Sequence, residues 1–298
     1  MILVDFSSSA ITSITVFKEE LKKDDKQVKD LIRHVILSTL VSYKKKFGAK
    51  YGQLVLCCDG RNYWRKEVFP NYKCKRKAQR EDSDIPWKLV FDTMTEMRNE
   101  LKEHFPYKII HNDRAEADDC IAILAKMSQT CDLAQDGIFM DEPQPVLIVA
   151  ADHDYAQLQK WDNVRQWSPK TKKFIDVGTT ALREGSIIHI VKGDTGDSVP
   201  NLFSDDNVFL DERRQKSVMQ PRLDEFLEKG FEACRSDEER RNWQRNEQLV
   251  SFDFIPDELE QAIISCYNDQ NPKMNRMGIF NYLTKNRCRL LLDSISDF

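Results

Sequence analysis

The chain has 298 residues, of which 41% are hydrophobic and 32% charged, and its formal net charge is −4 at pH 7. This apolar share is sufficient for a hydrophobic core and excludes a wholly disordered chain. The longest purely apolar run covers residues 146–151, whereas a membrane-spanning helix needs about 20 such residues, so we expect no membrane segment. We expect no signal peptide because residues 1–5 contain no basic segment, and the eight cysteines without a Cys-x-x-Cys pair indicate reduced, intracellular thiols.

Three short apolar runs predict buried strands of a parallel sheet, and each run is followed by an aspartate. These runs cover residues 2–4, 54–58 and 146–151. Apolar residues recur at helical spacing in residues 28–40 and 117–124, which lie between the runs, and a shorter strand is predicted at 109–110. Strands that alternate with helices predict an α/β fold with a central, mostly parallel sheet flanked by helices.

The composition changes after about residue 200. We therefore predict an α/β core at residues 1–200, which includes a basic region at about 61–86 and a glycine-containing turn at 192–200. Residues 205–248 are rich in charge and poor in strand signals, and helical spacing returns at 259–267 and 279–283. Residues 201–298 are accordingly predicted to form a smaller, mostly helical C-terminal region.

Acidic residues gather where a ligand site would lie in such a sheet, outside the carboxyl ends of the strands. Each apolar run ends at an aspartate, and further acids occur at the start of the predicted helix at 117–124 and in the turn at 192–200. Aspartate also caps helices and terminates strands, so each acid alone has a structural alternative. The nine candidates are Asp5, Asp59, Glu116, Asp118, Asp119, Asp152, Asp154, Asp194 and Asp197.

The residue types of this set favour a hard divalent cation. The chain has five histidines and no His-Glu-x-x-His motif, which argues against zinc. Ligands that are all oxygen suit Mg²⁺, for which Mn²⁺ can substitute. Since Mg²⁺ takes only one or two carboxylates directly, so many acids predict two ions with water-mediated contacts. Paired ions of this kind cleave phosphodiester bonds.

A strongly basic segment directly follows Asp59. Residues 61–80 contain eight lysines and arginines and one glutamate, hence a charge of +7, while the rest of the chain carries −11. Four aromatic residues alternate with these cations. Cations contact phosphates and aromatic rings stack on unpaired bases, so the segment predicts a nucleic-acid contact. The alternative is a solvated basic face with aromatic residues in the core.

The chain resembles the 5′-nuclease, or flap-endonuclease, superfamily over nearly its whole length. The matching stretches are residues 3–7, 55–59, 63–65, 72–73, 116–119, 152–158, 166–169, 192–197 and 252–256. The resemblance implies a nuclease core with a helical arch and two metal ions. It implies that Asp5, Asp59, Asp118 and Asp152 bind the first ion and that Asp154, Asp194 and Asp197 bind the second. Glu116 and Asp119 match acids that act directly or through water.

The resemblance also assigns roles in the basic segment. Lys73, Arg65 and Arg76 fall where arch residues steer the scissile phosphate, so the catalytic assignments are Lys73, Arg65, Asp118 and Asp152. The predicted nucleic-acid-binding set is Arg61, Arg65, Lys66, Tyr72, Lys73, Lys75, Arg76, Lys77 and Arg80. One departure concerns residues 200–208, which lack the glycines that in many relatives bind duplex phosphates, often with K⁺.

The implied activity is that of a metal-dependent 5′ to 3′ exonuclease and flap endonuclease with ribonuclease H activity. Such an enzyme removes RNA primers and adjacent DNA from the 5′ ends of lagging-strand fragments. Its implied substrates are DNA and RNA–DNA hybrids with free 5′ ends, forks and flaps. A single-stranded-DNA-binding protein or a sliding clamp is an expected partner. The protein is expected to be a phage-encoded monomer that acts in the cytoplasm of the bacterial host.

Three other readings use the same residues. A PIN-type ribonuclease has a similar acidic sheet edge, but such domains are usually shorter and lack the long basic segment and the turn at 193–200. A non-catalytic protein that binds nucleic-acid structures would not need the full set of acids. A phosphatase that forms an aspartyl phosphate needs an Asp-x-Asp-x-Thr motif at a strand end, and none is present here.

Overall fold

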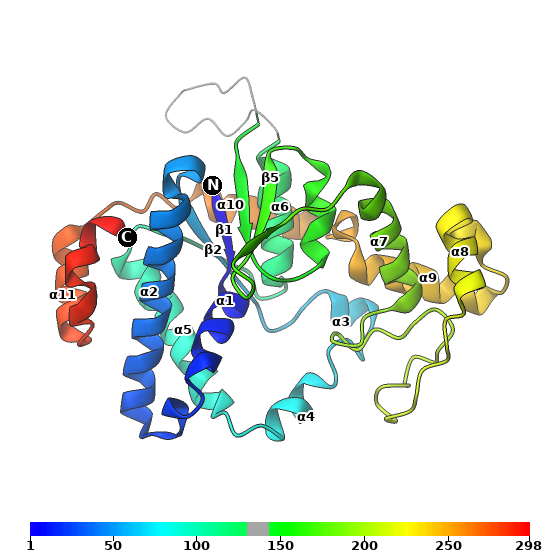
Figure 1. Ribbon diagram of the computed structural model, residues 1–298, viewed down its shortest axis with the longest axis horizontal. Coiled ribbons are helices and arrows are strands. Elements are labelled where there is room, and N and C mark those ends of the chain that lie inside the picture. The colour runs from blue at the N-terminus through cyan, green and yellow to red at the C-terminus, as the bar shows by residue number, and fades with distance from the viewer. Residues whose placement is uncertain (130–142) are drawn as a thin grey trace. The chain divides into compact units, whose positions relative to one another are not determined.

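The computed structural model describes residues 1–129 and 143–298 (Figure 1), and these residues form two compact units. Unit 1 contains residues 1–61, 84–176 and 257–298, and unit 2 contains residues 62–83 and 177–256. The units therefore do not follow the predicted boundary at residue 200. The last 42 residues fold with the sheet, and most of the basic segment folds with the helices of unit 2. Each unit is described by itself.

Unit 1 is built on a sheet with the strand order β3-β2-β1-β4-β5-β6 in the described residues. The strands are β1 (Ile2–Asp5), β2 (Leu54–Cys58), β3 (Lys108–His111), β4 (Val146–Val149), β5 (Val164–Ser168) and β6 (Lys173–Ile175). Neighbouring strands from β3 to β5 are parallel, and β6 pairs with β5 in the antiparallel direction. The predicted mostly parallel α/β sheet is confirmed, and β5 and β6 are added to it.

One face of the sheet packs against the long helices α2 (Asp25–Tyr51) and α5 (Trp87–His104), which lie side by side (Figure 1). Alternate strand residues, such as Ile2 and Val4, enter this core because successive side chains of a strand point to opposite faces. The core also receives α1 (Phe6–Ile14), α11 (Arg276–Lys285) and the 3₁₀ segment η6 (Arg289–Asp297). Shorter 3₁₀ turns, η1 (Thr15–Phe17) and η2 (Glu20–Lys22), connect α1 to α2.

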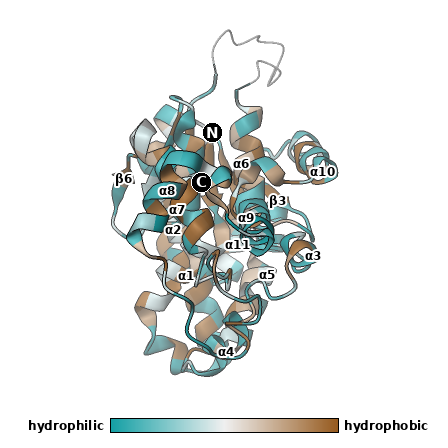
Figure 2. Ribbon diagram, turned by 90° about the vertical axis from the view of Figure 1, so that its right-hand side faces the viewer, coloured by the Kyte–Doolittle hydropathy of each residue, from teal (hydrophilic) through white to brown (hydrophobic). Residues whose placement is uncertain are grey.

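Helix α6 (Ala117–Met127) packs on β1 and β2, and α10 (Asp257–Asn268) packs on α6 and β3. Hydrophilic and hydrophobic residues both colour α10 in Figure 2, and its buried residues Leu259, Ile263 and Tyr267 recur at helical spacing, as predicted. Just beyond α10, the Gln270 amide contacts strand β3. Its Oε1 accepts a hydrogen bond from Ile109 N (2.9 Å), and its Nε2 donates one to Ile109 O (3.0 Å).

Unit 2 is helical. It contains α3 (Arg65–Val68), α4 (Arg76–Glu81), α7 (Thr179–Lys192), α8 (Gln220–Lys229), α9 (Asp237–Val250) and the turns η4 (Gly230–Ala233) and η5 (Phe252–Phe254). Phe226 and Trp243 stack in its main core at a ring separation of 5.6 Å. A second cluster joins Phe69 and Tyr72 of the basic segment to Val199 and Leu249. In the described part of the chain, no helix combines the length and apolar content needed to cross a bilayer.

Candidate functional site

Three predicted site residues follow three neighbouring strands of unit 1. Asp5 ends β1, Asp59 directly follows β2, and Asp152 lies three residues beyond β4. Because β1 is parallel to both β2 and β4, the carboxyl ends of the three strands lie at one edge. The strand order also changes direction between β1 and β4. In open α/β sheets, ligands bind outside the carboxyl ends at such a switch point.

Asp5 caps a helix, and Asp152 accepts a backbone hydrogen bond at the start of a 3₁₀ segment. The Oδ1 atom of Asp5 accepts a hydrogen bond from Ser8 N (2.8 Å) and caps α1. The Oδ1 atom of Asp152 accepts one from Asp154 N (3.1 Å), where the 3₁₀ segment η3 (Asp154–Lys160) begins. The capping alternative raised by the sequence is therefore realised for Asp5, and the N-termini of α1 and η3 both lie at the acidic edge.

The start of α6 is fixed by carboxylates from two parts of unit 1. Asp59 Oδ1 accepts a hydrogen bond from Ala117 N (3.0 Å), the first residue of the helix. Asp119 Oδ2 accepts one from Glu116 N (2.9 Å) within a capping box. Glu116 and Asp119 are buried, whereas Asp118 between them is half-buried. These caps orient α6 so that Asp118 lies at the same edge as Asp5 and Asp59.

A buried tyrosine lies among these carboxylates. Tyr155 is fully buried, and its hydroxyl donates a hydrogen bond to Asp118 Oδ1 and lies 3.4 Å from Asp5 Oδ2. Burial raises the pKa of Tyr155 well above its usual value, and the carboxylates of Asp118, Asp5 and Asp152 raise it further. Three acids from three segments therefore surround one neutral hydroxyl. The sequence assigned no role to Tyr155, and its only signal was its place directly after Asp154.

The thiol of Cys57 on β2 lies near the same acids. Burial raises its pKa, and Cys58 and the carboxylates of Asp5, Asp118 and Asp59 raise it further. Asp118 and Asp5 meet at the Tyr155 hydroxyl, Asp59 contacts the first residue of α6, and Asp152 follows the adjacent strand β4, so the four acids lie at one edge of unit 1.

These acids are not already arranged around a cation. Across residues 1–129 and 143–298, no three His, Cys, Asp or Glu side chains are close enough around one point to hold a metal ion. Their oxygens accept hydrogen bonds from helix N–H groups and from the Tyr155 hydroxyl instead. The donor set, made only of carboxylate oxygens, fits a hard divalent cation in its chemistry. Binding would require some of these side chains to rotate.

Gln166 on β5 supports the turn that carries Asp152. Its buried side-chain amide donates hydrogen bonds to Ala150 O (3.1 Å) and to Asp152 O (2.6 Å). The backbone between β4 and η3 is thereby tied to the neighbouring strand. The sequence placed residue 166 within a matching stretch but gave its side chain no role.

The turn that carries Asp194 and Asp197 begins at the end of α7 in unit 2. Gly193 has a φ of 65°, and a Cβ atom there would lie 2.4 Å from Val199 O, so only glycine fits without a shift. Asp194 Oδ1 accepts a hydrogen bond from Gly196 N (2.7 Å). The imidazole of His189, 3.5 Å from Asp194 Oδ2, is the main cause that lowers the pKa of Asp194 to about 2. Asp194 is therefore a firmly ionised carboxylate.

Asp197 contacts the basic segment within unit 2. Its Oδ2 atom accepts a hydrogen bond from the Tyr72 hydroxyl (2.8 Å), and its Oδ1 atom accepts one from Arg76 Nη2 (2.5 Å). The Lys73 ammonium lies 3.4 Å from Oδ2, and Lys73 N donates to Asp197 O (2.7 Å). A residue predicted to bind metal is thus neutralised by two residues predicted to steer a phosphate.

The other basic residues divide into buried and exposed groups. Arg65 is only 3% exposed, and its Nε donates to Leu249 O (2.9 Å) at the end of α9. Arg65 therefore packs against α9, and Tyr72 is also buried, while the predicted nucleic-acid contacts of both residues stay predictions. Arg61 in unit 1 and Lys66, Lys77 and Arg80 in unit 2 are exposed, whereas Lys73, Lys75 and Arg76 are half-buried.

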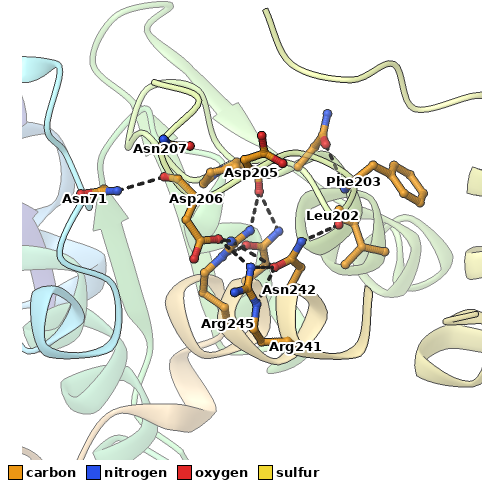
Figure 3. A network of polar contacts seen from close by, with 12 residues as sticks. Asn71, Leu202, Phe203, Asp205, Asp206, Asn207, Arg241, Asn242 and Arg245 are labelled. Atoms are coloured by element: carbon orange, nitrogen blue, oxygen red, sulfur yellow. Dashed lines mark hydrogen bonds and ion pairs between the residues drawn. The ribbon is translucent and has the colours of Figure 1, made fainter. Parts of the chain in front are cut away.

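The segment after the turn, which lacks the expected glycines, is held by the polar face of α9 (Figure 3). Arg245 forms an ion pair with Asp206, and its Nη2 donates to Pro200 O (3.1 Å). Arg241 pairs with the same carboxylate at 3.0 Å. The buried Asn246 amide also donates to Pro200 O (3.0 Å). The acidic residues of this segment are therefore neutralised within unit 2.

Two models of known protein families together match the whole chain. Residues 1–185 match the model of the N-terminal resolvase-like domain of 5′-3′ exonucleases, and residues 184–298 match the C-terminal region of T4 RNase H. The ribonuclease H of Enterobacteria phage T4 is 30% identical over 305 aligned positions, which cover 99% of this chain and 95% of that protein.

Solved structures of a bacteriophage T5 protein share the fold at lower identity. The T5 D15 protein co-crystallised with metal ions has a TM-score of 0.60 and 16% identity, covering 90% of this chain and 97% of that one. The T5 D15 flap endonuclease in a complex with DNA and metal ions has a TM-score of 0.61 and 16% identity, covering 90% and 99%. The family predicted from the motifs is confirmed: the chain belongs to the 5′-3′ exonuclease family of phosphodiester-cleaving nucleases.

Proposed function

We propose that this protein is a metal-dependent 5′ to 3′ nuclease that acts as an exonuclease and as a flap endonuclease. The observation that supports this most directly is the gathering of Asp5, Asp59, Asp118 and Asp152 at the switch point of the sheet. The T4 relative is named ribonuclease H, which supports RNA in RNA–DNA hybrids as a substrate beside DNA. Removal of RNA primers and adjacent DNA is the proposed role, in the cytoplasm of a phage-infected host.

The proposed cofactor is a pair of Mg²⁺ ions, for which Mn²⁺ can substitute. Asp5, Asp59, Asp118 and Asp152 are the proposed ligands of the first ion, and the T5 structures with metal ions are consistent with a divalent cation. When bound, such ions supply a water nucleophile at neutral pH and stabilise negative charge on the phosphate. Asp154, Asp194 and Asp197 remain predicted ligands of a second ion.

The residues of the chain have separate tasks in this proposal. Asp118 supplies a carboxylate to the proposed ion, while buried Glu116 and Asp119 hold the start of α6 in place. The exposed Lys77 and Arg80 attract the phosphate backbone through long-range charge. Lys73 and Arg76 both contact Asp197, so a phosphate that they bind shares these cations with that carboxylate.

DNA with a free 5′ end is the proposed partner, and the T5 complex with DNA supports this class of ligand. A monomeric state and contacts with a single-stranded-DNA-binding protein or a sliding clamp stay predictions. Phe298 is buried, with its ring centroid 5.0 Å from that of Phe105, so this aromatic side chain is not an accessible handle for a partner.

The proposal is tested with 5′-labelled substrates, a recessed RNA–DNA hybrid and a DNA flap, each with Mg²⁺ or with a chelator. Asp118→Asn should lower the cleavage rate at least about 100-fold, because it removes a carboxylate from the acidic edge. Asp162→Asn is the matched control, since Asp162 is exposed in the turn before β5 of the same unit.

Equal rates for wild type and Asp118→Asn would reject the metal assignment. Release of nucleotides from 3′ ends alone would reject the proposed function. Cleavage of single-stranded RNA without regard to its 5′ end would favour the PIN-type ribonuclease. Binding of the flap without any cleavage would favour a non-catalytic protein.

A further inference from the structure

The Tyr155 hydroxyl contacts the carboxylates of both Asp118 and Asp5 in unit 1. We propose that Tyr155 is a positioning residue whose hydroxyl keeps the carboxylates of Asp118 and Asp5 beside each other at the acidic edge before a divalent cation binds. The inference rests on the proposed function, because it assumes that these carboxylates bind the cation. Tyr155 itself is not a ligand in this proposal, since its neutral hydroxyl acts through the carboxylates.

The contacts of the hydroxyl show how it would act. A tyrosine hydroxyl has one proton, so the closer contact, to Asp118 Oδ1, is the hydrogen bond, and Asp5 Oδ2 at 3.4 Å is the alternative acceptor. Asp5 Oδ1 accepts from Ser8 N (2.8 Å), and this bond orients the Asp5 carboxylate with its Oδ2 beside the Tyr155 hydroxyl. The hydroxyl therefore links the last residue of β1 to the first turn of α6.

The burial of the ring fixes the place of the hydroxyl. Tyr155 is fully buried, and it is the second residue of η3, whose first residue Asp154 donates its N–H to Asp152 Oδ1 (3.1 Å). A phenolic hydroxyl carries one proton and is a neutral hydrogen-bond donor at neutral pH. A buried side chain with one χ1 orientation presents its donor in a constant direction, which suits a positioning role.

The physical need for such a donor follows from repulsion between carboxylates. Two carboxylates that approach one point repel each other unless a cation or hydrogen bonds compensate. A shared neutral donor lowers this cost before a cation binds. Hydrogen bonds that orient metal-binding carboxylates typically contribute about 10–100-fold to metal affinity. The opposite effect has a physical cause too. A hydroxyl that competes with the cation for the Asp118 oxygen would weaken cation binding.

The test is a calorimetric titration of the full chain with Mn²⁺, comparing wild type with Tyr155→Phe. The phenylalanine ring fills the same space and removes only the hydroxyl. We expect Mn²⁺ affinity to fall about 10–100-fold. Tyr107→Phe is the matched control, because Tyr107 is buried in unit 1 and its hydroxyl has no hydrogen-bond partner within residues 1–129 and 143–298. Its affinity should equal that of wild type, and circular dichroism should show both variants folded.

A double-mutant cycle identifies the carboxylate through which the hydroxyl acts. In the Asp118→Asn background, Tyr155→Phe should change Mn²⁺ affinity much less than it does in wild type, because the two residues share one interaction. Cleavage by Tyr155→Phe should be slow at limiting Mg²⁺ and recover at saturating Mg²⁺, with the substrate KM unchanged. A role only in packing would not give this rescue by metal.

The outcomes separate this inference from the proposed function. If wild type binds no Mn²⁺, the proposed metal-dependent function fails. If wild type binds Mn²⁺ and Tyr155→Phe binds it equally well or more tightly, the positioning role fails while the nuclease proposal stands. An equal loss in Tyr107→Phe would show that the effect is one of general stability and would also overturn the positioning role.

Discussion

Arg76 and Asp197 form an ion pair in which Nη2 lies 2.5 Å from Oδ1, and this pair ties the start of α4 to the turn after α7. The side chain of Asp197 is only 18% exposed, so the pair is partly shielded from water. Lys73 and Tyr72 contact the same carboxylate. The segment at residues 62–83 is therefore anchored within unit 2 by the packing of Phe69 and Tyr72 and by the polar contacts of Asp197, which is a predicted metal ligand.

This relationship predicts how the basic segment responds when the anchor is removed. Asp197→Ala should expose the lysines and arginines of residues 62–83 to trypsin, because Lys73 and Arg76 lose their common partner. We expect cleavage about tenfold faster, as when local opening becomes ~1.4 kcal/mol easier. Glu81→Ala is the control, since Glu81 lies in the same segment with a side chain 68% exposed. Identical proteolysis of Asp197→Ala and wild type would show that the anchor lies elsewhere.

The exposed and buried arginines of the basic segment should respond differently to alanine. Arg80→Ala removes an exposed cation and should weaken flap-DNA binding, lowering the slope of log K against log salt by about 0.7–0.9. Arg65→Ala removes the donor to Leu249 O and should lower the free energy of unfolding by about 1–3 kcal/mol with the salt slope unchanged. Fluorescence anisotropy and urea unfolding measure the two effects. A salt slope that falls in Arg65→Ala would return that residue to the phosphate contacts.

The hydrogen bonds of Asn246 lead us to expect a loss of stability when its buried amide is removed. Asn246 is fully buried on α9, and its Nδ2 donates to Ile190 O (2.7 Å) and to Pro200 O (3.0 Å). Asn246→Ala should lower the free energy of unfolding by about 1–3 kcal/mol, because two carbonyls lose a donor in a buried place. Gln244→Ala, at an exposed position of the same helix, is the control in urea unfolding. If the two variants unfold alike, the amide does not hold the segment after the turn.

The contacts of Glu100 on α5 lead us to expect that the stability of unit 1 falls at low pH. The Glu100 carboxylate pairs with Arg33 of α2 (2.9 Å) and accepts a hydrogen bond from the Tyr282 hydroxyl (2.5 Å). Burial alone would raise the pKa of Glu100, but the hydrogen bonds from Arg33 and Tyr282 outweigh it and lower the pKa below the ordinary 4.5. A carboxyl group with a lowered pKa contributes stability above pH 4.5 and loses it as pH falls through the folded-state pKa.

Glu100→Gln should therefore unfold more easily than wild type at pH 7, by about 1–3 kcal/mol. The difference should shrink below pH 4.5, where wild type loses the contribution that the variant never had. Urea unfolding from pH 7 to pH 3 measures it. The control is Glu103→Gln, on the same helix with a side chain 75% exposed. A difference that stays constant with pH would mean that the charge of Glu100 is not involved.

The strands that the sequence revealed are those buried on both faces. Parallel strands of that kind read as continuous apolar runs, which is why β1, β2 and β4 and the acids at their ends could be predicted. Strand β5 gave no such signal, because its Arg165 and Gln166 interrupt the apolar pattern. Gln166 is nonetheless buried, since its amide satisfies backbone carbonyls of the adjoining turn. A buried polar residue of this kind depends on tertiary partners that periodicity cannot show.

The sequence indicated which acids form the candidate site, but not which residues they contact. The acids at strand ends and at the start of α6 came from local patterns, whereas the position of Tyr155 among them depends on how η3 packs against β1 and α6. Arg65 looks like a phosphate ligand in a run of cations, and only the fold shows that it caps the end of α9. The division into two units was equally hidden, because it depends on contacts such as Arg65 with Leu249, 184 positions apart.

The contact between Gln270 and Ile109 has a consequence for the behaviour of the sheet in solution. Strand β3 ends the sheet, and the edge of a sheet can recruit the strand of another molecule. The Gln270 amide makes with Ile109 the two hydrogen bonds that a neighbouring strand would make. The segment after α10 therefore covers the edge of β3 at Ile109, and a strand of another molecule would have to displace Gln270 to pair there.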